Sequence, residues 1–67
     1  MYKPAILFRA KCFAKTPLDV ISGRHYEAIF PKRYKTSYGA INFAKHQIEG
    51  DKDVWQLPAS KQEEESE

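Results

Sequence analysis

The stretch that decides the fold is residues 36–48, T-S-Y-G-A-I-N-F-A-K-H-Q-I. It is the one run in the chain that is long and periodic enough to predict a stable helix. At about 100° per residue, its apolar residues gather on one side of a helical wheel and its polar residues on the other. Thr36 is expected to cap the N-terminus through its hydroxyl, and Gly50 to end the helix. The apolar side consists of Tyr38, Ala40, Ile41, Phe43, Ala44 and Ile48.

The residues before this helix predict two strands. Residues 5–15 alternate between two sets of side chains, which is typical of a half-buried strand. The more apolar set is expected to meet the helix: Ile6, Phe8, Ala10, Cys12 and Ala14. Residues 24–30 predict a second strand, with Tyr26, Ala28 and Phe30 as its core set. Pro31 then interrupts the ladder, and residues 32–35 resume it as a short extension toward the helix.

Residues 16–23, T-P-L-D-V-I-S-G, predict a connection between these two strands. It is too short for a crossover helix, so the strands are expected to pair antiparallel. Its apolar residues either cover one end of the core or extend a strand. After the helix, residues 53–57 predict a third strand that Pro58 closes.

The expected fold is a small α+β domain of the order strand, strand, helix, strand. A three-stranded antiparallel sheet carries one helix on one face, and residues 1–58 form a single domain. Residues 59–67 are expected to be a disordered acidic tail. The second face of the sheet is predicted to stay open, and it would present Leu7, Arg9, Lys11, Phe13, His25, Glu27 and Ile29.

The charge of the chain is divided unevenly. Residues 1–50 carry nine Lys or Arg and three Asp or Glu, whereas residues 51–67 carry two Lys and six acids. The net charge of +2 therefore combines a basic body with an acidic end. A basic body indicates anionic partners, although a solvated, solubilising surface explains the same pattern.

The residue types argue against an enzyme. The single cysteine, Cys12, excludes an internal disulfide, and its place on the apolar side of the first strand predicts a small buried core residue. One Cys and two separated His give no zinc-ligand spacing, and the body offers no pair of carboxylates and no phosphate-binding glycine loop. We therefore expect no catalysis, no cofactor, no metal and no small-molecule substrate. A small secreted domain would usually carry an even number of cysteines, so the single one predicts a cytoplasmic protein, and no apolar run is long enough to span a membrane.

Basic residues interleaved with aromatic ones are the strongest functional signal. Lys and Arg supply phosphate affinity, and exposed rings stack on bases. The opposing interpretation is that the cations are ordinary solvated charges and the rings belong to the core. The predicted partner-binding residues are Arg9, Lys11, Phe13, Arg24, His25, Glu27, Lys32, Arg33, Tyr34 and Lys35.

The order of elements, with a capped helix that carries Thr36, Ala40 and Ala44 before a Trp-containing strand, resembles two families. It resembles small phage-encoded proteins that bind and inhibit host enzymes. It also resembles, more distantly, the arm-type DNA-binding domain of phage tyrosine integrases, whose sheet reads the major groove. The second resemblance implies a reading face with Arg9, Lys11, Arg24 and Glu27. The acidic end departs from that family, whose domain normally continues into a linker and a catalytic domain.

Two functions from different classes follow. The first, which the small size and the apolar residues of the open face slightly favour, is an effector from a phage or mobile element that binds a larger host protein and inhibits or redirects it in the host cytoplasm. The second is a nucleic-acid-binding domain that uses a basic sheet face and residues 32–35. Salt discriminates them, because phosphate-driven binding falls steeply as salt rises.

Overall fold

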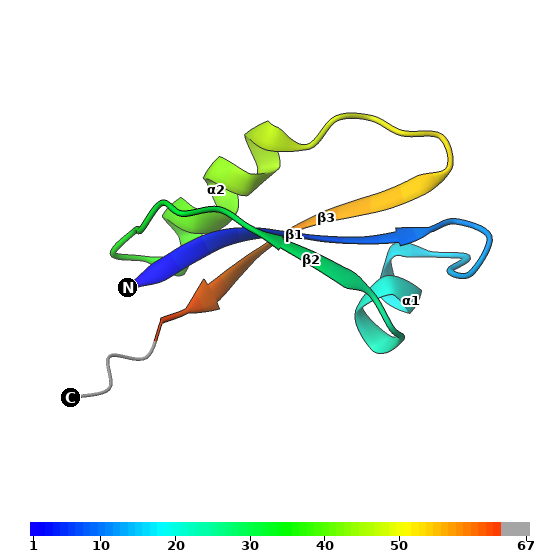
Figure 1. The fold of residues 1–67 in the computed structure, drawn as a ribbon, viewed down its shortest axis with the longest axis horizontal. Helices are drawn as coiled ribbons and strands as arrows, with labels where there is room; N and C mark the ends of the chain where they lie inside the picture. The colour runs from blue at the N-terminus through cyan, green and yellow to red at the C-terminus, as the bar shows by residue number, and fades with distance from the viewer. Residues whose placement is uncertain (64–67) are drawn as a thin grey trace.

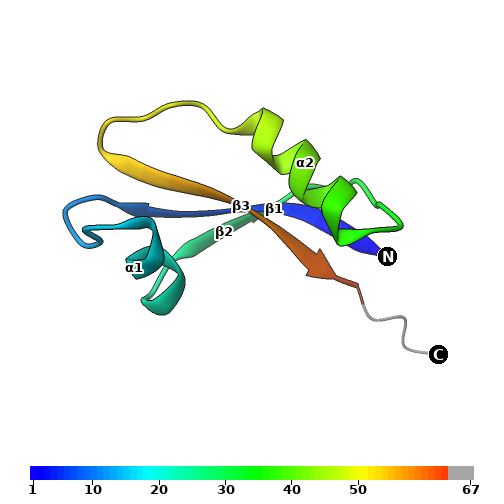
Figure 2. The ribbon, with the colours of Figure 1, turned by 180° about the vertical axis from the view of Figure 1, so that it is seen from behind.

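The computed structural model describes residues 1–63 as a three-stranded antiparallel sheet with two helices (Figure 1). The sheet has the order β2-β1-β3. Helix α2 lies on one face, and α1 lies on the other face at one end (Figures 1 and 2). The predicted α+β class is confirmed, and the prediction of a single helix is wrong. The elements are β1 (Tyr2–Ala10), α1 (Pro17–Ser22), β2 (Tyr26–Ile29), α2 (Ser37–Gln47) and β3 (Val54–Gln62).

Helix α2 forms where the sequence predicts it. The Thr36 hydroxyl accepts a hydrogen bond from the backbone N–H of Gly39 at 3.2 Å, which confirms the predicted cap. Ala40 and Ala44 are fully buried, and their small side chains let the helix backbone approach the sheet closely. The helix ends with Ile48 as its C-cap, two residues before Gly50.

Strand β1 begins and ends earlier than predicted. It runs from Tyr2 to Ala10, and the chain then turns, with the N–H of Phe13 donating to the carbonyl of Ala10 at 3.0 Å. The alternation of a strand therefore does not extend to residues 11–15. Cys12 lies in this turn and is exposed, so the prediction of a buried core cysteine is wrong.

Residues 16–23 contain a helix instead of a plain connection. The Asp19 carboxylate accepts from the backbone N–H groups of Lys15 at 3.1 Å and Thr16 at 3.0 Å, and Pro17 occupies the first turn, where its missing N–H is not needed. Val20 is fully buried. Of the two alternatives left by the sequence, covering one end of the core is correct for Val20, whereas Leu18 and Ile21 are exposed.

Strand β3 passes through Pro58 and continues to Gln62. Phe30 donates to the carbonyl of Pro4, so even-numbered residues of β1 bond toward β2 and odd-numbered ones toward β3. Pro58 lies opposite Ile6, where β3 makes no backbone bond to β1, and its missing N–H costs the ladder nothing. The predicted end at residue 57 and the predicted disorder of residues 59–62 are wrong. Residues 64–67, the rest of the predicted tail, lie outside the described part.

Strand β2 is short and fully exposed, because α2 packs across β1 and β3. Of the predicted core set, only Phe30 is half-buried. Its ring packs edge-on against the ring of Phe43 on α2, with the two ring centres 5.5 Å apart. Ala28 is exposed, and Tyr26 is 73% exposed and stacks on Phe8 at 5.7 Å. The core set of this strand was therefore predicted wrongly for two of its three residues.

The cap of α2 gives a direct test of this fold. Thr36→Ala removes the oxygen that accepts from Gly39, which should cost about 1 kcal/mol of the free energy of unfolding. In a domain of this size that loss corresponds to a fall in Tm of about 4–8 °C. Thermal unfolding followed by circular dichroism measures it. Thr36→Ser, which keeps the hydroxyl, should unfold close to the wild type, and an equal loss in both variants would contradict the capping role.

Candidate functional site

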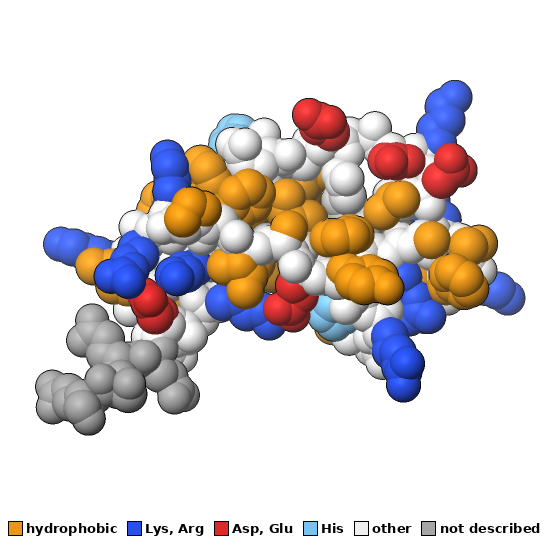
Figure 3. Space-filling model, viewed as in Figure 1, with side chains coloured by type: hydrophobic (Ala, Val, Ile, Leu, Met, Phe, Trp, Pro, Cys, Tyr) orange, Lys and Arg blue, Asp and Glu red, His pale blue; other side chains and the backbone are white. Residues whose placement is uncertain are grey.

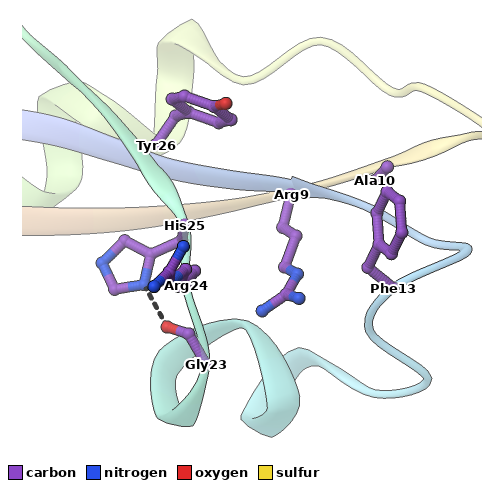
Figure 4. Close-up of a pocket in the computed structure, with 7 residues that line it drawn as sticks. All are labelled: Arg9, Ala10, Phe13, Gly23, Arg24, His25 and Tyr26. Atoms are coloured by element: carbon purple, nitrogen blue, oxygen red, sulfur yellow. Dashed lines mark hydrogen bonds between the residues drawn. The ribbon is translucent and has the colours of Figure 1, made fainter.

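A pocket of about 640 Å³ opens between the sheet and α1 (Figure 4). It lies where β1 ends, where β2 begins and where the turn after β1 folds back. Four of the ten predicted binding residues line it, namely Arg9, Phe13, Arg24 and His25. Its other three lining residues, Ala10, Gly23 and Tyr26, were not among the predicted ones. The pocket is therefore built largely from the predicted basic and aromatic residues.

Arg9 reaches from β1 toward α1 into the middle of this pocket (Figure 4). Its side chain is half-buried, and its guanidinium lies 5.8 Å from the centre of the Phe13 ring. The ion pairs within residues 1–63 all involve other cations. A guanidinium carries five N–H donors in a fixed planar fork. Arg9 therefore offers its donors to the pocket with no carboxylate of the described chain bound to them.

Gly23 makes this position of Arg9 possible. A Cβ atom at Gly23 would collide with the Nη1 atom of Arg9 and would lie 3.0 Å from the carbonyl oxygen of Asp19. The end of α1 thus forms a wall against which the guanidinium packs. The sequence predicted a turn at this glycine, but the reason for the glycine is close approach, because its φ angle is not positive.

His25 lines the pocket, and both of its ring nitrogens lie close to oxygen atoms. Its Nδ1 atom lies 2.9 Å from the carbonyl oxygen of Val20 and 3.1 Å from that of Gly23, and its Nε2 atom lies 3.4 Å from the Glu27 carboxylate. Carbonyl and carboxylate oxygens only accept hydrogen bonds. An N–H group at Nδ1 is therefore placed to donate to these two carbonyl oxygens, and Nε2 faces the Glu27 carboxylate.

The carboxylate that faces His25, that of Glu27, is engaged with a lysine. Its carboxylate accepts from the Lys61 ammonium at 2.6 Å, and this bond, with a smaller contribution from His25, holds the pKa of Glu27 below its ordinary value. The strand registers place Glu27 and Lys61 on the two sides of the fully buried Ala5, so the pair crosses β1 over it. Glu27, predicted as a binding residue, is thus an internal partner.

Lys11 lies beside the pocket and does not line it. Its ammonium sits 4.7 Å from the centre of the Trp55 ring, whose Nε1–H donates to the carbonyl of Ala14 at 2.7 Å. A cation over an indole face is attracted to the ring. This contact holds the Lys11 side chain next to β3. The half-buried Trp55 holds the turn after β1 through its bond to Ala14.

The predicted cluster at residues 32–35 lies apart from the pocket. Tyr34 pairs with Tyr2 at the start of β1, whereas the pocket lies at the end of β1, in a molecule 41 Å long. Cationic side chains accordingly gather toward both ends in Figure 3. The ten predicted binding residues are therefore divided between the two ends of the molecule.

The cations of this second cluster are already in contact with other groups. The Arg33 guanidinium pairs with the Glu63 carboxylate at 3.0 Å, and Lys3 approaches the same carboxylate at 3.6 Å. Lys32 lies 4.6 Å from the centre of the Phe43 ring, and Tyr34 packs against that ring at 6.0 Å. Lys35 is exposed. The second cluster is thus partly neutralised, whereas Arg9 has no ion pair within residues 1–63.

The pocket can bind an anion and stack a flat ring. Within residues 1–63, no three His, Cys, Asp or Glu side chains gather closely enough to hold a metal ion, and no helix is long and apolar enough to cross a membrane. No protein-family model, no curated protein and no solved structure matches this chain. The function must therefore be inferred from the pocket and its surroundings.

The Glu27–Lys61 contact predicts a pH-dependent stability. Because the folded pKa of Glu27 is lowered, its contribution is complete above the ordinary value of about 4.5 and is lost as the pH falls through the folded pKa. Glu27→Gln should therefore lower Tm at pH 7 and make little difference well below pH 4. Thermal unfolding of both proteins across this range tests it. A gap between wild type and variant that stays constant down to the acid limit would contradict the assignment.

Proposed function

We propose that this chain is a small, non-catalytic nucleic-acid-binding protein that holds a single strand at the pocket beside α1. The observation that carries the proposal is Arg9, a half-buried guanidinium that has no acidic partner within residues 1–63 and lies next to the exposed ring of Phe13. Partial removal of a cation from water without a partner is unfavourable, and a bound phosphate would offset that cost.

The cations of the pocket suit a phosphate. The fork of Arg9 can donate two parallel hydrogen bonds to phosphate oxygens, and Arg24 adds positive charge at the same opening. Glu27 does not cancel this charge, because Lys61 holds its carboxylate. The site therefore combines directed donors with a local excess of positive charge.

The exposed ring of Phe13 favours a single strand over a duplex. Phe13 is 72% exposed beside Arg9 and has a face or edge free for an unpaired base, whereas the Tyr26 ring lies on the opposite face of the sheet, stacked on Phe8 (Figure 4). In a duplex the bases are stacked on one another and are not accessible to such rings. The sheet face that would enter a major groove is also occupied at one end by α1 (Figure 2).

Binding to labelled single-stranded oligonucleotides over a range of salt concentrations tests this proposal. Arg9→Gln should weaken binding and reduce the slope of log affinity against log salt by about 0.7 for each phosphate that the variant no longer neutralises. Phe13→Ala should remove stacking worth about 1–3 kcal/mol per base and leave the salt slope nearly unchanged. Fluorescence anisotropy gives both the affinity and the slope.

Two variants of equal charge change serve as controls. Lys45→Gln removes an exposed cation of α2, and Arg33→Gln removes a cation that Glu63 already pairs. Both should cost less affinity than Arg9→Gln. An equal loss in all three variants would indicate a diffuse charge effect without a pocket, and no binding at low salt would refute the proposal.

A host-protein partner remains the second candidate, because the α1 end also exposes apolar side chains. Leu18 is 75% exposed and Ile21 is 58% exposed, both on α1 and at the same end of the molecule as Phe13. Such side chains suit a protein interface. In that case Leu18→Ala would weaken binding to the partner and moderate salt would not, which is the reverse of the nucleic-acid pattern.

A further inference from the structure

The two outer strands of the sheet are very different as edges. All four residues of β2 are exposed, whereas β3 is half-buried along almost its whole length and packs against α2. The outer side of β3 also carries Pro58, which offers no N–H there. Within residues 1–63, β2 is thus the edge that is available for pairing with another strand.

The backbone of β2 presents a short, regular set of hydrogen-bonding groups to solvent. Phe30 bonds to Pro4 of β1, so the even-numbered residues of β2 turn their N–H and C=O groups inward. Glu27 and Ile29 therefore turn theirs outward. An antiparallel partner strand can exchange two hydrogen bonds with each of these two residues, which makes four in total.

We propose that this edge pairs with β2 of a second copy of the chain, antiparallel, about a twofold axis at Ala28. In that register Ala28 faces the partner's Ala28, and Glu27 faces the partner's Ile29. Tyr26 faces the partner's Phe30. The two sheets then join into one sheet of six strands.

The side chains of β2 are self-complementary in this register. Ala28 sits at the position without backbone bonds, where the strands come closest, and its methyl group is small enough for that approach. Glu27 lies opposite the partner's Ile29 and not opposite a second carboxylate, and its charge is already paired with Lys61. Tyr26, 73% exposed in the single copy, gains an aromatic neighbour across the strands.

The same geometry explains why the assembly would stop at two copies. A twofold contact uses the same edge of both chains and leaves only β3 at the two outer ends. Pro58 and the packing of α2 make β3 a poor template for further strands. The proposed product is therefore a closed dimer and not a fibre.

The dimer would also bring the residue 32–35 cluster of one copy close to the pocket of the other copy. Continuing the register beyond β2 places Arg24 opposite the partner's Lys32, next to the pocket that holds Arg9. These like charges repel each other, so salt should strengthen the dimer, whereas it weakens nucleic-acid binding. A polyanion would bridge both clusters and favour the dimer as well. This last consequence rests on the proposed function, but the dimer itself does not.

Sedimentation equilibrium of the chain without nucleic acid, at low and at high salt, tests the dimer. We expect a concentration-dependent mass that approaches two copies and a tighter dimer at high salt. Ile29→Pro removes one outward N–H and Ala28→Lys places two cations at the axis, so both should stay monomeric, while Ile29→Val should dimerise like the wild type. A wild type that is monomeric under all conditions would overturn the proposal, even if the edge binds some other peptide.

Cysteine cross-linking tests the register in a background of Cys12→Ser. The proposed axis brings the two Cα atoms of residue 28 to about 4.5 Å, within the range of a disulfide. Ala28→Cys should therefore form a dimeric disulfide under mild oxidation, and Gln56→Cys on β3 should not. Equal cross-linking at both positions would overturn the twofold axis at Ala28. Because no nucleic acid is present, a failure here leaves the proposed function untouched, and the reverse also holds.

Discussion

The ion pair between Lys61 and Glu27 connects the two outer strands across β1, and the arrangement of charge in the molecule depends on it. Its atoms are largely solvated, so its contribution to stability is small. Its effect is on position: it engages a carboxylate that lies on the same face of the sheet as Arg9. It also sets Glu27 where its oxygen faces Nε2 of His25. The pocket keeps its positive charge because this acid is bound by a lysine of the far strand.

Local sequence was sufficient for α2 and insufficient for α1 and β3. The period and the cap at Thr36 lie within one segment, so the helix could be predicted almost to the residue. α1 has six residues, fewer than two turns, and its pattern resembles that of a turn. Pro58 by itself predicts the end of a strand. The Pro58 nitrogen faces away from β1 because Pro58 pairs with Ile6, more than fifty positions earlier. Local sequence does not indicate that pairing.

The candidate site was predictable in composition but not in grouping. The sequence singled out Arg9, Phe13, Arg24 and His25, and these four residues line one pocket. Nothing in the sequence indicated that Gly23 would form the wall against Arg9, because that contact requires α1 to fold back on the sheet. Residues 32–35 were grouped with them on charge alone, and the fold places them at the other end of β1.

The ion pairs distinguish the two basic clusters more clearly than the number of their positive charges does. Arg33 and Arg9 are the same residue type, yet the first holds the Glu63 carboxylate and the second holds no acid within residues 1–63. Net charge counts both equally, whereas an incoming anion must displace an existing partner at Arg33 and none at Arg9. A site for an anion is therefore best sought where a cation is half-buried and unmatched. In this chain those conditions meet beside α1, where a helix too short to predict holds a guanidinium against its last turn.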